Sequence, residues 1–375
     1  MADHDSSPPD PGVFRTLGND LRVVWQQIAD SGASRTFHRS IDELEGFYLS
    51  THSRDRLAAM RRGKRTVYLS LWLLKALFLK LTPSRRLLLL LSMWLLWVGV
   101  LNVSVGRQQV TVQFPFLGIA VLLFVLMLEL KDKLLARNEL EAGRAVQLAL
   151  MPDRPPSFPG WDIWLFTRSA NDVGGDLVDY LRIDPQRLAV ALGDVAGKAL
   201  PAALLMAKLQ ATLRALASQC PSLGELGRQV NRILNRDGLP NRFATLVYLE
   251  LAPDSGRVRL LNAGHMPPLL VQAGSIRETP PGGIALGIVP EADFVEQQVE
   301  LQAGDLLLVY SDGVTDAMNG AGEFFGEERL RAALAAVATS TAEVAGRSLL
   351  AAADAFTGDA RAFDDLSLVV LKRLA

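Results

Sequence analysis

Cysteine and histidine are scarce in this chain of 375 residues, which has one cysteine, Cys220, and four histidines. A single cysteine excludes an intrachain disulfide framework and a cysteine-based zinc site, and a lone cysteine is usually a small buried apolar residue. The four histidines are scattered and form no metal-binding motif. The sequence also shows no Cys–His or Ser–His arrangement for nucleophilic catalysis.

An excess of either charge is lacking as well: 39 Lys and Arg balance 40 Asp and Glu, for a net charge of −1. This balance gives no electrostatic footprint for nucleic acid, so we expect no nucleic-acid partner. The first thirty residues are polar and lack the apolar core of a cleavable signal peptide. What the chain does have is apolar sequence, and it is distributed unevenly.

Two uncharged runs of nineteen residues each, 87–105 and 110–128, have about the length that a helix needs to cross a bilayer. We place the spans at about 86–105 and 110–130. A short loop with one charge, Arg107, separates the runs, and both outer flanks are basic. The positive-inside rule then puts both flanks in the cytoplasm. The sequence predicts a multi-pass protein of the cell inner membrane with a cytoplasmic C-terminal domain. A buried helical hairpin is less favoured, because neither run has a polar face.

Residues 66–81 are mostly apolar but contain Lys75 and Lys80, so this helix could lie in the membrane interface or could span it. We favour the interfacial helix, because the basic run 61–65 before it prefers the cytoplasm. The predicted organisation is a cytoplasmic, partly disordered N-terminal region (1–65), a membrane region (66–130), a linker helix (131–152) and a soluble domain (153–375).

The linker helix (131–152) is predicted because residues 131–151 are good helix formers throughout. Leu135, Ala142 and Ala149 are spaced seven apart, in a weak heptad that Glu139 interrupts. The helix could pair with a second copy in a homodimer or could be a solvated connector, and the two alternatives have about equal support. Four prolines between positions 152 and 159 end the helix.

From Trp161 onward, strand-like and helix-like runs alternate. The strand-like runs follow one another closely and are joined by turn signals such as "PDSG" (253–256). This succession favours antiparallel sheets with helices packed outside, an α+β architecture. The expected strands are 161–166, 187–194, 244–251, 257–264, 267–274, 305–312 and 366–373. The expected helices are 199–218, 222–236, 327–338 and 342–356.

Aspartates recur where segments of this domain begin or end. The five at such positions are Asp176, Asp194, Asp312, Asp364 and Asp365. Any one of them alone is more simply a turn former or a helix cap. Together, each near a glycine or a second aspartate, they favour a shared site, and oxygen-only ligands suit hard cations such as Mg²⁺ or Mn²⁺. About four carboxylates neutralise two divalent cations, which can clamp a phosphoryl group.

Seven segments resemble, in order, the motifs of the bacterial PPM-type (2C-type) protein-serine phosphatases of the SpoIIE/RsbU-like branch. They are "DVGGDLVDY", "GDVAGKALPAALLMA", "FATLVYLEL", "NAGHMPPLL", "GGIALGI", "YSDGVTDAMNGAGEFFGEERL" and "FDDLSLVVL". The resemblance covers about 139–373, and seven ordered motifs make it specific. It implies an αββα sandwich, two antiparallel sheets flanked by helices, which here follows a transmembrane helical hairpin. Residues 153–375 would form the phosphatase domain.

The resemblance also implies an activity: metal-dependent hydrolysis of phosphoserine or phosphothreonine on a regulatory protein, typically an anti-sigma-factor antagonist of the STAS fold. Two divalent cations, Mn²⁺ or Mg²⁺, would be needed. Their ligands would be the side chains of Asp176, Asp194, Asp312 and Asp364 and the backbone carbonyl of Val195. Supporting roles would fall to Gly174, Gly175, Gly313 and Asp365.

Some positions depart from the family's pattern. Glu is common where Asp172 and Asp316 stand, and an aromatic pair is usual at positions 177–178. All four primary aspartates remain, so we expect an active enzyme; the alternative is a catalytically silent adaptor that binds a phosphorylated or STAS-type partner. Arg168 and Lys198 are candidates for binding phosphate only by proximity in sequence. We expect His265 and Asp179 to be structural.

Overall fold

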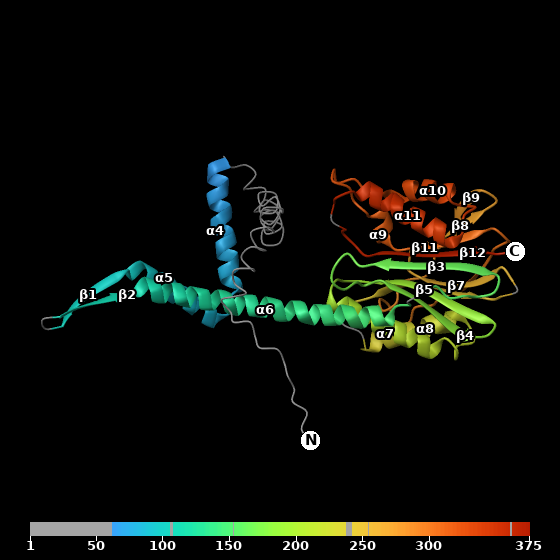
Figure 1. Ribbon diagram of the computed structural model, residues 1–375. Helices are drawn as coiled ribbons and strands as arrows, with labels where there is room; N and C mark the ends of the chain where they lie inside the picture. Colours follow the sequence, from blue (N-terminus) through green and yellow to red (C-terminus); the bar gives the residue numbers. More distant parts are fainter. Residues whose placement is uncertain (1–61, 106–107, 153, 238–241, 254, 361) are drawn as a thin grey trace, which may run out of the picture. The chain divides into compact units, whose positions relative to one another are not determined.

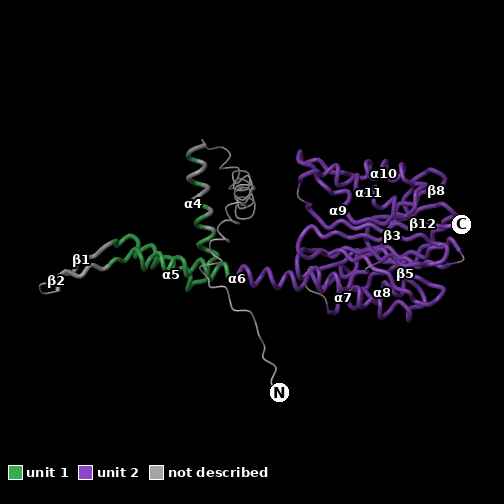
Figure 2. Tube along the Cα trace, viewed as in Figure 1, with its two compact units in different colours: residues 1–132 green, residues 133–375 purple. Residues whose placement is uncertain are grey.

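The computed structural model of the chain describes residues 62–375 except 106–107, 153, 238–241, 254 and 361 (Figure 1). The region predicted to be cytoplasmic and partly disordered, 1–65, lies almost wholly outside the described residues. The chain divides into two compact units, Met1–Asp132 and Lys133–Ala375, which we describe separately (Figure 2).

The described residues of the N-terminal unit form helices and a β-hairpin. Its elements are α4 (Arg62–Lys80), α5 (Pro83–Val98), β1 (Val100–Val105), β2 (Gln108–Gln113) and the first part of α6 (Phe114–Leu150). The helix predicted over 66–81 lies in α4. The predicted linker helix is the C-terminal part of α6, which runs on from the apolar segment without a break and ends at Leu150.

Neither predicted membrane span is helical over its full length. The span predicted at 86–105 ends as a helix at Val98, and the span predicted at 110–130 becomes helical only at Phe114. The residues between pair as the antiparallel strands β1 and β2. Gly99, with φ 68°, ends α5 in a conformation that favours glycine, and the alternating valines that follow favour a strand. Hydropathy counts these valines as apolar and does not register their preference for strands.

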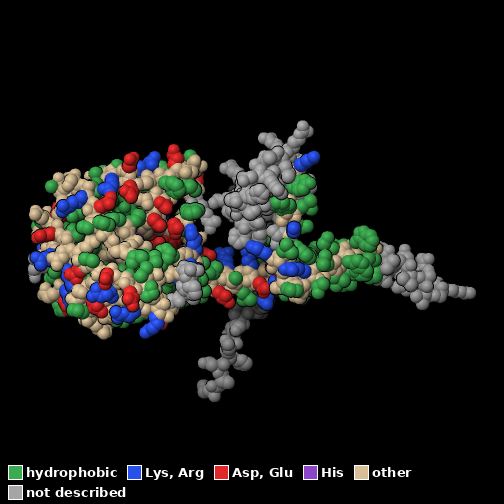
Figure 3. All heavy atoms as spheres, turned by 180° about the vertical axis from the view of Figure 1, so that it is seen from behind, with side chains coloured by type: hydrophobic (Ala, Val, Ile, Leu, Met, Phe, Trp, Pro, Cys, Tyr) green, Lys and Arg blue, Asp and Glu red, His purple; other side chains and the backbone are tan. Residues whose placement is uncertain are grey.

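Within the described residues, α6 alone is long and apolar enough to cross a membrane. The shorter α5 packs closely against α6 at Gly118, where the lack of a side chain lets the two backbones approach. A Cβ at this position would lie 3.0 Å from the Ser92 carbonyl oxygen of α5. Large apolar side chains of both helices are exposed, and green spheres cover this part of the molecule in Figure 3. Trp97 and Met127 are among the exposed residues. An exposed apolar surface of this kind marks a contact with a membrane or a partner.

The C-terminal unit is an αββα sandwich, as predicted (Figure 1). One antiparallel sheet has the strand order β10-β7-β6-β5-β4, and the other has the order β3-β12-β11-β8-β9. Helices α7 and α8 cover the first sheet, and α10 and α11 cover the second. The strands are β3 (Trp161–Arg168), β4 (Leu177–Asp184), β5 (Arg187–Val195), β6 (Ala244–Leu251), β7 (Arg257–Ala263), β8 (Leu269–Gln272), β9 (Ser275–Glu278), β10 (Glu296–Glu300), β11 (Leu306–Tyr310) and β12 (Leu366–Arg373). The helices are α7 (Leu200–Leu216), α8 (Leu223–Asp237), α9 (Asp312–Thr315), α10 (Gly326–Ala336) and α11 (Ala342–Thr357).

The central strands are apolar on both faces because helices cover the outer face of each sheet. In β5, Ala189 and Ala191 pack toward α7 and α8, while Val190 and Leu192 pack against the other sheet. Each strand therefore reads as a nearly continuous apolar run. The strand predicted over 267–274 is the shorter β8, and the chain then turns at Ala273–Gly274, where both residues have positive φ, into β9, a strand that was not predicted.

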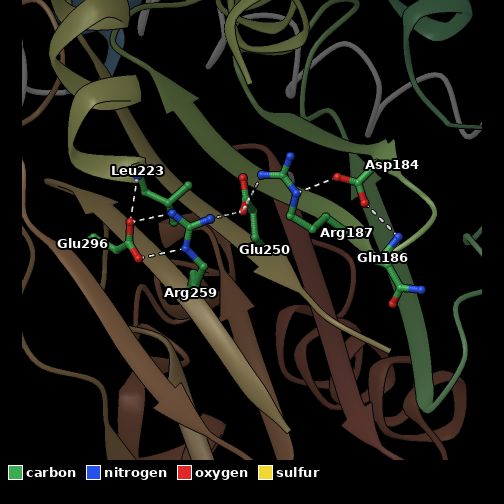
Figure 4. Close-up of polar contacts among 7 residues, drawn as sticks. All are labelled: Asp184, Gln186, Arg187, Leu223, Glu250, Arg259 and Glu296. Atoms are coloured by element: carbon green, nitrogen blue, oxygen red, sulfur yellow. Dashed lines mark hydrogen bonds and ion pairs between the residues drawn. The ribbon is translucent and has the colours of Figure 1, made fainter. Parts of the chain in front are cut away.

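A row of alternating charges crosses the first sheet at the end where β5 begins. We call it the charge ladder; its members are Asp184, Arg187, Glu250, Arg259 and Glu296 (Figure 4). Glu250 is 4% exposed and accepts a 2.6 Å hydrogen bond from Arg259. Glu296 accepts two bonds from Arg259 and a third from the backbone N–H of Leu223, at the start of α8. The ladder thus neutralises each buried charge and ties a helix to the sheet.

Candidate functional site

The five aspartates singled out in the sequence come together at the opposite end of the sandwich. We call them the acid cluster: Asp176, Asp194, Asp312, Asp364 and Asp365. Asp176 directly precedes β4 and Asp194 lies near the end of β5, so the first sheet supplies these two. Asp312 follows β11, and Asp364 and Asp365 precede β12, so the second sheet supplies the rest. The topology therefore brings carboxylates from residues almost 190 positions apart to one place.

The electrostatics of these groups show how close they are. Burial raises the pKa of Asp176 well above its usual value, and repulsion by Asp194 adds to this effect. Burial, followed by repulsion from Asp312 and Asp364, raises the pKa of Asp194 to about 6. The pKa of Asp312 is raised by burial and then by Asp364. Carboxylates of both sheets thus face a common space.

Two members of the acid cluster also form close hydrogen bonds. Asp176 accepts a 2.5 Å bond from the hydroxyl of Ser367, which lies on β12. Asp365 accepts bonds from the backbone N–H groups of Ala170, at 2.8 Å, and Gly175, at 2.6 Å. Because both carboxylate oxygens of Asp365 hold the loop before Asp176, a supporting role fits it better than a ligand role.

The glycine pair before Asp176 is required by space. A Cβ on Gly175 would lie 3.0 Å from the Val195 carbonyl oxygen and 3.5 Å from the Asp194 carboxylate, and a Cβ on Gly174 would collide with the carboxylate of Asp365. Gly313 likewise faces the backbone carbonyl of Asp365 too closely for any side chain. The backbone can therefore pass directly beside the acid cluster only where glycine stands.

The donor chemistry of the acid cluster fits a hard divalent cation, which prefers carboxylate and carbonyl oxygens. Within the described residues, however, no three His, Cys, Asp or Glu side chains converge tightly enough to form a ready-made ligand set. Beyond the effect of burial, the carboxylates are near enough to raise the pKa of Asp194 by mutual repulsion. The composition of the site fits a metal, and its present geometry does not enclose one.

The two basic candidates lie beside the acid cluster but are already engaged. Lys198 lies 3.5 Å from an Asp364 oxygen, donates to the Phe363 carbonyl and stacks on the Phe363 ring. Arg168 forms a two-pronged ion pair with Asp354 of α11, at 2.5 and 3.2 Å. Both Arg168 and Asp354 line a cavity of about 210 Å³ that reaches Asp364 and Gly313. A group bound at the acid cluster would have this cavity next to it.

Asp179, on β4, forms an ion pair with an arginine and is not a member of the acid cluster. Arg214 of α7 binds both of its carboxylate oxygens, at 2.6 and 2.8 Å. This ion pair fastens a helix to the sheet, in agreement with the structural role expected from the sequence.

Known proteins similar to this chain include a matching family, curated relatives and solved structures. A family model described as Stage II sporulation protein E (SpoIIE) matches residues 184–374, more than half of the chain. The chain belongs to the SpoIIE family. The matched stretch includes four members of the acid cluster and begins after the fifth, Asp176.

Similar proteins include Protein IcfG of Synechocystis sp., 28% identical over 276 residues, which are 65% of this chain and 43% of IcfG. Phosphoserine phosphatase RsbU of Bacillus subtilis is 25% identical over 182 residues, 48% of this chain and 54% of RsbU. The chain thus spans about half the length of these relatives. Among solved structures, the RsbU and RsbW domains of Rv1364c from Mycobacterium tuberculosis match with a TM-score of 0.51 and 29% identity, over 59% of this chain and 62% of that one.

Several side chains that hold the acid cluster and His265 in place were not found from the sequence. Gln147, near the end of α6, is buried and exchanges two hydrogen bonds with the backbone of Gly174. Ser367 orients Asp176, and Thr245 and Asn262 contact His265. They are ordinary polar residues in helix or strand sequences, and only the packing of the sheets shows what they touch.

Proposed function

We propose that this chain is a membrane-anchored, metal-dependent protein-serine/threonine phosphatase that acts on a regulatory phosphoprotein. The observation that carries the proposal is the acid cluster, in which aspartates from both sheets repel one another and Lys198 is the cation at the rim. Carboxylates alone repel a phosphate ester, so hydrolysis at this place requires bound cations. Membership of the SpoIIE family and the activity named for RsbU support the same function.

The residues divide the work between them. Asp176, Asp194, Asp312, Asp364 and the Val195 carbonyl would hold two cations, Mn²⁺ or Mg²⁺. When bound, such cations supply an activated water and neutralise charge on the phosphoryl oxygens. The chain itself positions the groups: Ser367 orients Asp176, and Asp365 fastens the loop that contains Gly174 and Gly175. Lys198 places a positive charge at the rim, where a phosphoryl oxygen can be received.

The direct test is turnover of a phosphoserine peptide by the full chain in detergent with Mn²⁺. Asp312→Ala should lower the rate by more than about 100-fold, beyond the effect usual for residues that only support a metal ligand. Asp359→Asn, a change at an exposed aspartate outside the acid cluster, is the matched control and should leave the rate unchanged. Equal rates for the wild type and Asp312→Ala would defeat the proposal.

A catalytically silent adaptor is the second candidate, favoured by the lack of a ready-made ligand set within the described residues. Titration calorimetry with Mn²⁺ separates the two functions. A phosphatase should bind the cation with a stoichiometry near two and lose this binding in Asp312→Ala. An adaptor should bind its phosphorylated partner and show no cation binding.

The membrane anchor and the partner are further parts of the proposal. Exposed apolar side chains along α5 and the first half of α6 support insertion of these two helices in the cell inner membrane, with the phosphatase domain in the cytoplasm. The family resemblance of the sequence motifs implies an anti-sigma-factor antagonist of the STAS type as substrate, and the name of the relative RsbU, a phosphoserine phosphatase, supports a phosphoserine on that substrate. Leu135, half exposed in α6, supports pairing of this helix with a second copy. Cross-linking through Leu135→Cys in membranes should give dimers, and recovery of monomers alone would count against this pairing.

A further inference from the structure

His265 lies buried in the turn after β7, at the same end of the sandwich as the acid cluster. Its Nε2 atom is 3.0 Å from the Tyr310 carbonyl oxygen, and its Nδ1 atom is 2.7 Å from the Thr245 hydroxyl. A carbonyl oxygen only accepts hydrogen bonds, so Nε2 must carry the hydrogen and donate it. In a neutral ring Nδ1 is then an acceptor, and the Thr245 hydroxyl donates to it. One imidazole therefore connects β6 of the first sheet with β11 of the second.

The position of this ring is itself fixed. The side-chain amide of Asn262, a buried residue of β7, accepts a hydrogen bond from the backbone N–H of His265 at 2.9 Å and donates one to the backbone carbonyl of His265 at 3.0 Å. Gly264, with φ 69°, makes the turn, and a Cβ there would lie 2.8 Å from the Ala285 Cα. Asn262 holds the backbone of His265, and Gly264 before it packs closely against Ala285. The imidazole is therefore fixed in place while it bonds to Thr245 and to Tyr310.

Both partners of the ring lead directly to the acid cluster. Thr245 is the residue paired with Asp194 between β5 and β6, and its hydroxyl also lies 3.4 Å from the Asp194 carbonyl oxygen. Tyr310 is the last residue of β11 and stands two positions before Asp312. The distance between these two strand ends is thus spanned by a single side chain.

We propose that His265 is a positioning residue whose neutral imidazole sets the separation between the strand end with Asp194 and the strand end with Asp312. This inference rests on the proposed function, because that separation matters only if the two aspartates share a ligand. A role in proton transfer is not compatible with the geometry, since both ring nitrogens are engaged with groups of the fold. Burial lowers the pKa of His265 to about 4, so the neutral form persists at neutral pH.

The first test needs no metal and no substrate. In the full chain in detergent with ¹⁵N-labelled histidine, long-range ¹H–¹⁵N spectra should show one residue fixed as the Nε2–H tautomer at neutral pH. Loss of this signal in His265→Phe would assign it to His265. A signal for the Nδ1–H tautomer, or for a ring that exchanges between tautomers, would overturn the proposal.

The second test measures what the two ring hydrogen bonds of His265, which tie β6 to β11, control. His265→Phe keeps a planar aromatic ring, somewhat larger than imidazole, and removes both bonds, so Mn²⁺ affinity and kcat should each fall about 10- to 100-fold, while KM for the phosphopeptide stays unchanged. Thr245→Val should give part of this loss, whereas Thr245→Ser, which keeps the hydroxyl, should retain wild-type values. The double variant His265→Phe/Thr245→Val should bind Mn²⁺ no more weakly than His265→Phe alone.

A control for general loss of stability is Arg259→Met, in the charge ladder, which should lower stability and leave Mn²⁺ affinity unchanged. Mn²⁺ binding by His265→Phe equal to that of the wild type or of Arg259→Met would overturn the proposal. If the wild type itself bound no Mn²⁺, the proposed function would fail instead. Hydrogen exchange at the Ser311 amide would then still decide whether the tie exists: faster exchange in His265→Phe supports it, and unchanged exchange refutes it.

Discussion

The two ends of the first sheet use the same residue types in opposite ways. Seven positions of β5 separate Arg187 in the charge ladder from Asp194 in the acid cluster, about 23 Å along a strand. At the ladder end, each carboxylate has an arginine beside it, and the buried Glu250 lies between two (Figure 4). At the other end, the carboxylates have one another as neighbours, and Lys198 only touches the rim.

The difference separates carboxylates that serve folding from carboxylates that, in the proposed function, hold a ligand. A buried charge is tolerated when an opposite charge and hydrogen bonds compensate for lost water. The ladder meets this condition, although burial still raises the pKa of Glu250 against the effect of both arginines. The acid cluster meets it less well, because burial and mutual repulsion raise the pKa of its carboxyl groups, and in the proposed function bound cations would compensate for this cost. Such a stability cost is typical of functional sites.

The largest expected effect on stability comes from breaking the compensated end. Arg259→Met should leave Glu250 buried beside a single, more distant arginine, and should lower the free energy of unfolding by about 3–5 kcal/mol. Urea unfolding of the full chain in detergent, followed by circular dichroism, measures it. The double variant Arg259→Met/Glu250→Leu removes both buried charges and should regain most of this loss. If the double variant were no more stable than the single one, the uncompensated charge would not be the cause.

The next effect contrasts two aspartates of one segment. Asp176→Asn should lower turnover by more than about 100-fold, and should raise the thermal midpoint of the metal-free protein, because repulsion by Asp194 and Asp365 is relieved. Asp179→Asn, three residues on, weakens the ion pair with Arg214 and should lower the midpoint while keeping most of the turnover. Phosphopeptide assays and thermal melts with and without Mn²⁺ test both variants. The reverse order of turnover would show that the wrong aspartate has been placed in the site.

A smaller effect concerns strain beside the acid cluster. Ala199, between Lys198 and α7, has φ 63° and ψ −156°, a region that is open essentially only to glycine. Ala199→Gly should stabilise the fold by about 1 kcal/mol, since relief of about 1–3 kcal/mol of strain exceeds the entropy cost of glycine. Ala211→Gly, at an exposed position within α7, is the control and should destabilise by about 1 kcal/mol. Equal destabilisation by both changes, seen in urea unfolding, would show that Ala199 is not strained.

The sandwich was predictable because its strands are marked by strong local signals. Runs such as 187–194 and 366–373 are apolar on both faces and match β5 and β12 closely. The membrane region was less predictable, since an uncharged run rich in valine satisfies a hydropathy window whether it forms a helix or, as at 100–105 and 108–113, the strands of a β-hairpin. β10, with the polar sequence "EQQVE", has no local strand signal and is defined by its pairing with β7.

The acid cluster was predictable for a different reason: aspartates beside glycines at element boundaries are visible in sequence, and the motif order placed them in one family. The residues that arrange them were not visible. Thr245 and His265 are 20 positions apart, and Gln147 and Gly174 are 27 apart. Which of them meet depends on how two sheets and a helix pack, a property that no local pattern encodes.

The smallest expected effect lies at the outer end of the charge ladder. Asp184 and Arg187 are each 37% exposed, and an ion pair in contact with solvent contributes little to stability. Asp184→Asn should therefore leave the urea midpoint and the turnover unchanged within error, in contrast to Arg259→Met. A clear loss would mean that the ladder acts as one connected network, in which Asp184 orients Arg187 toward Glu250. Combining Asp184→Asn with Arg259→Met then decides the matter: independent pairs give additive losses, and a connected network does not.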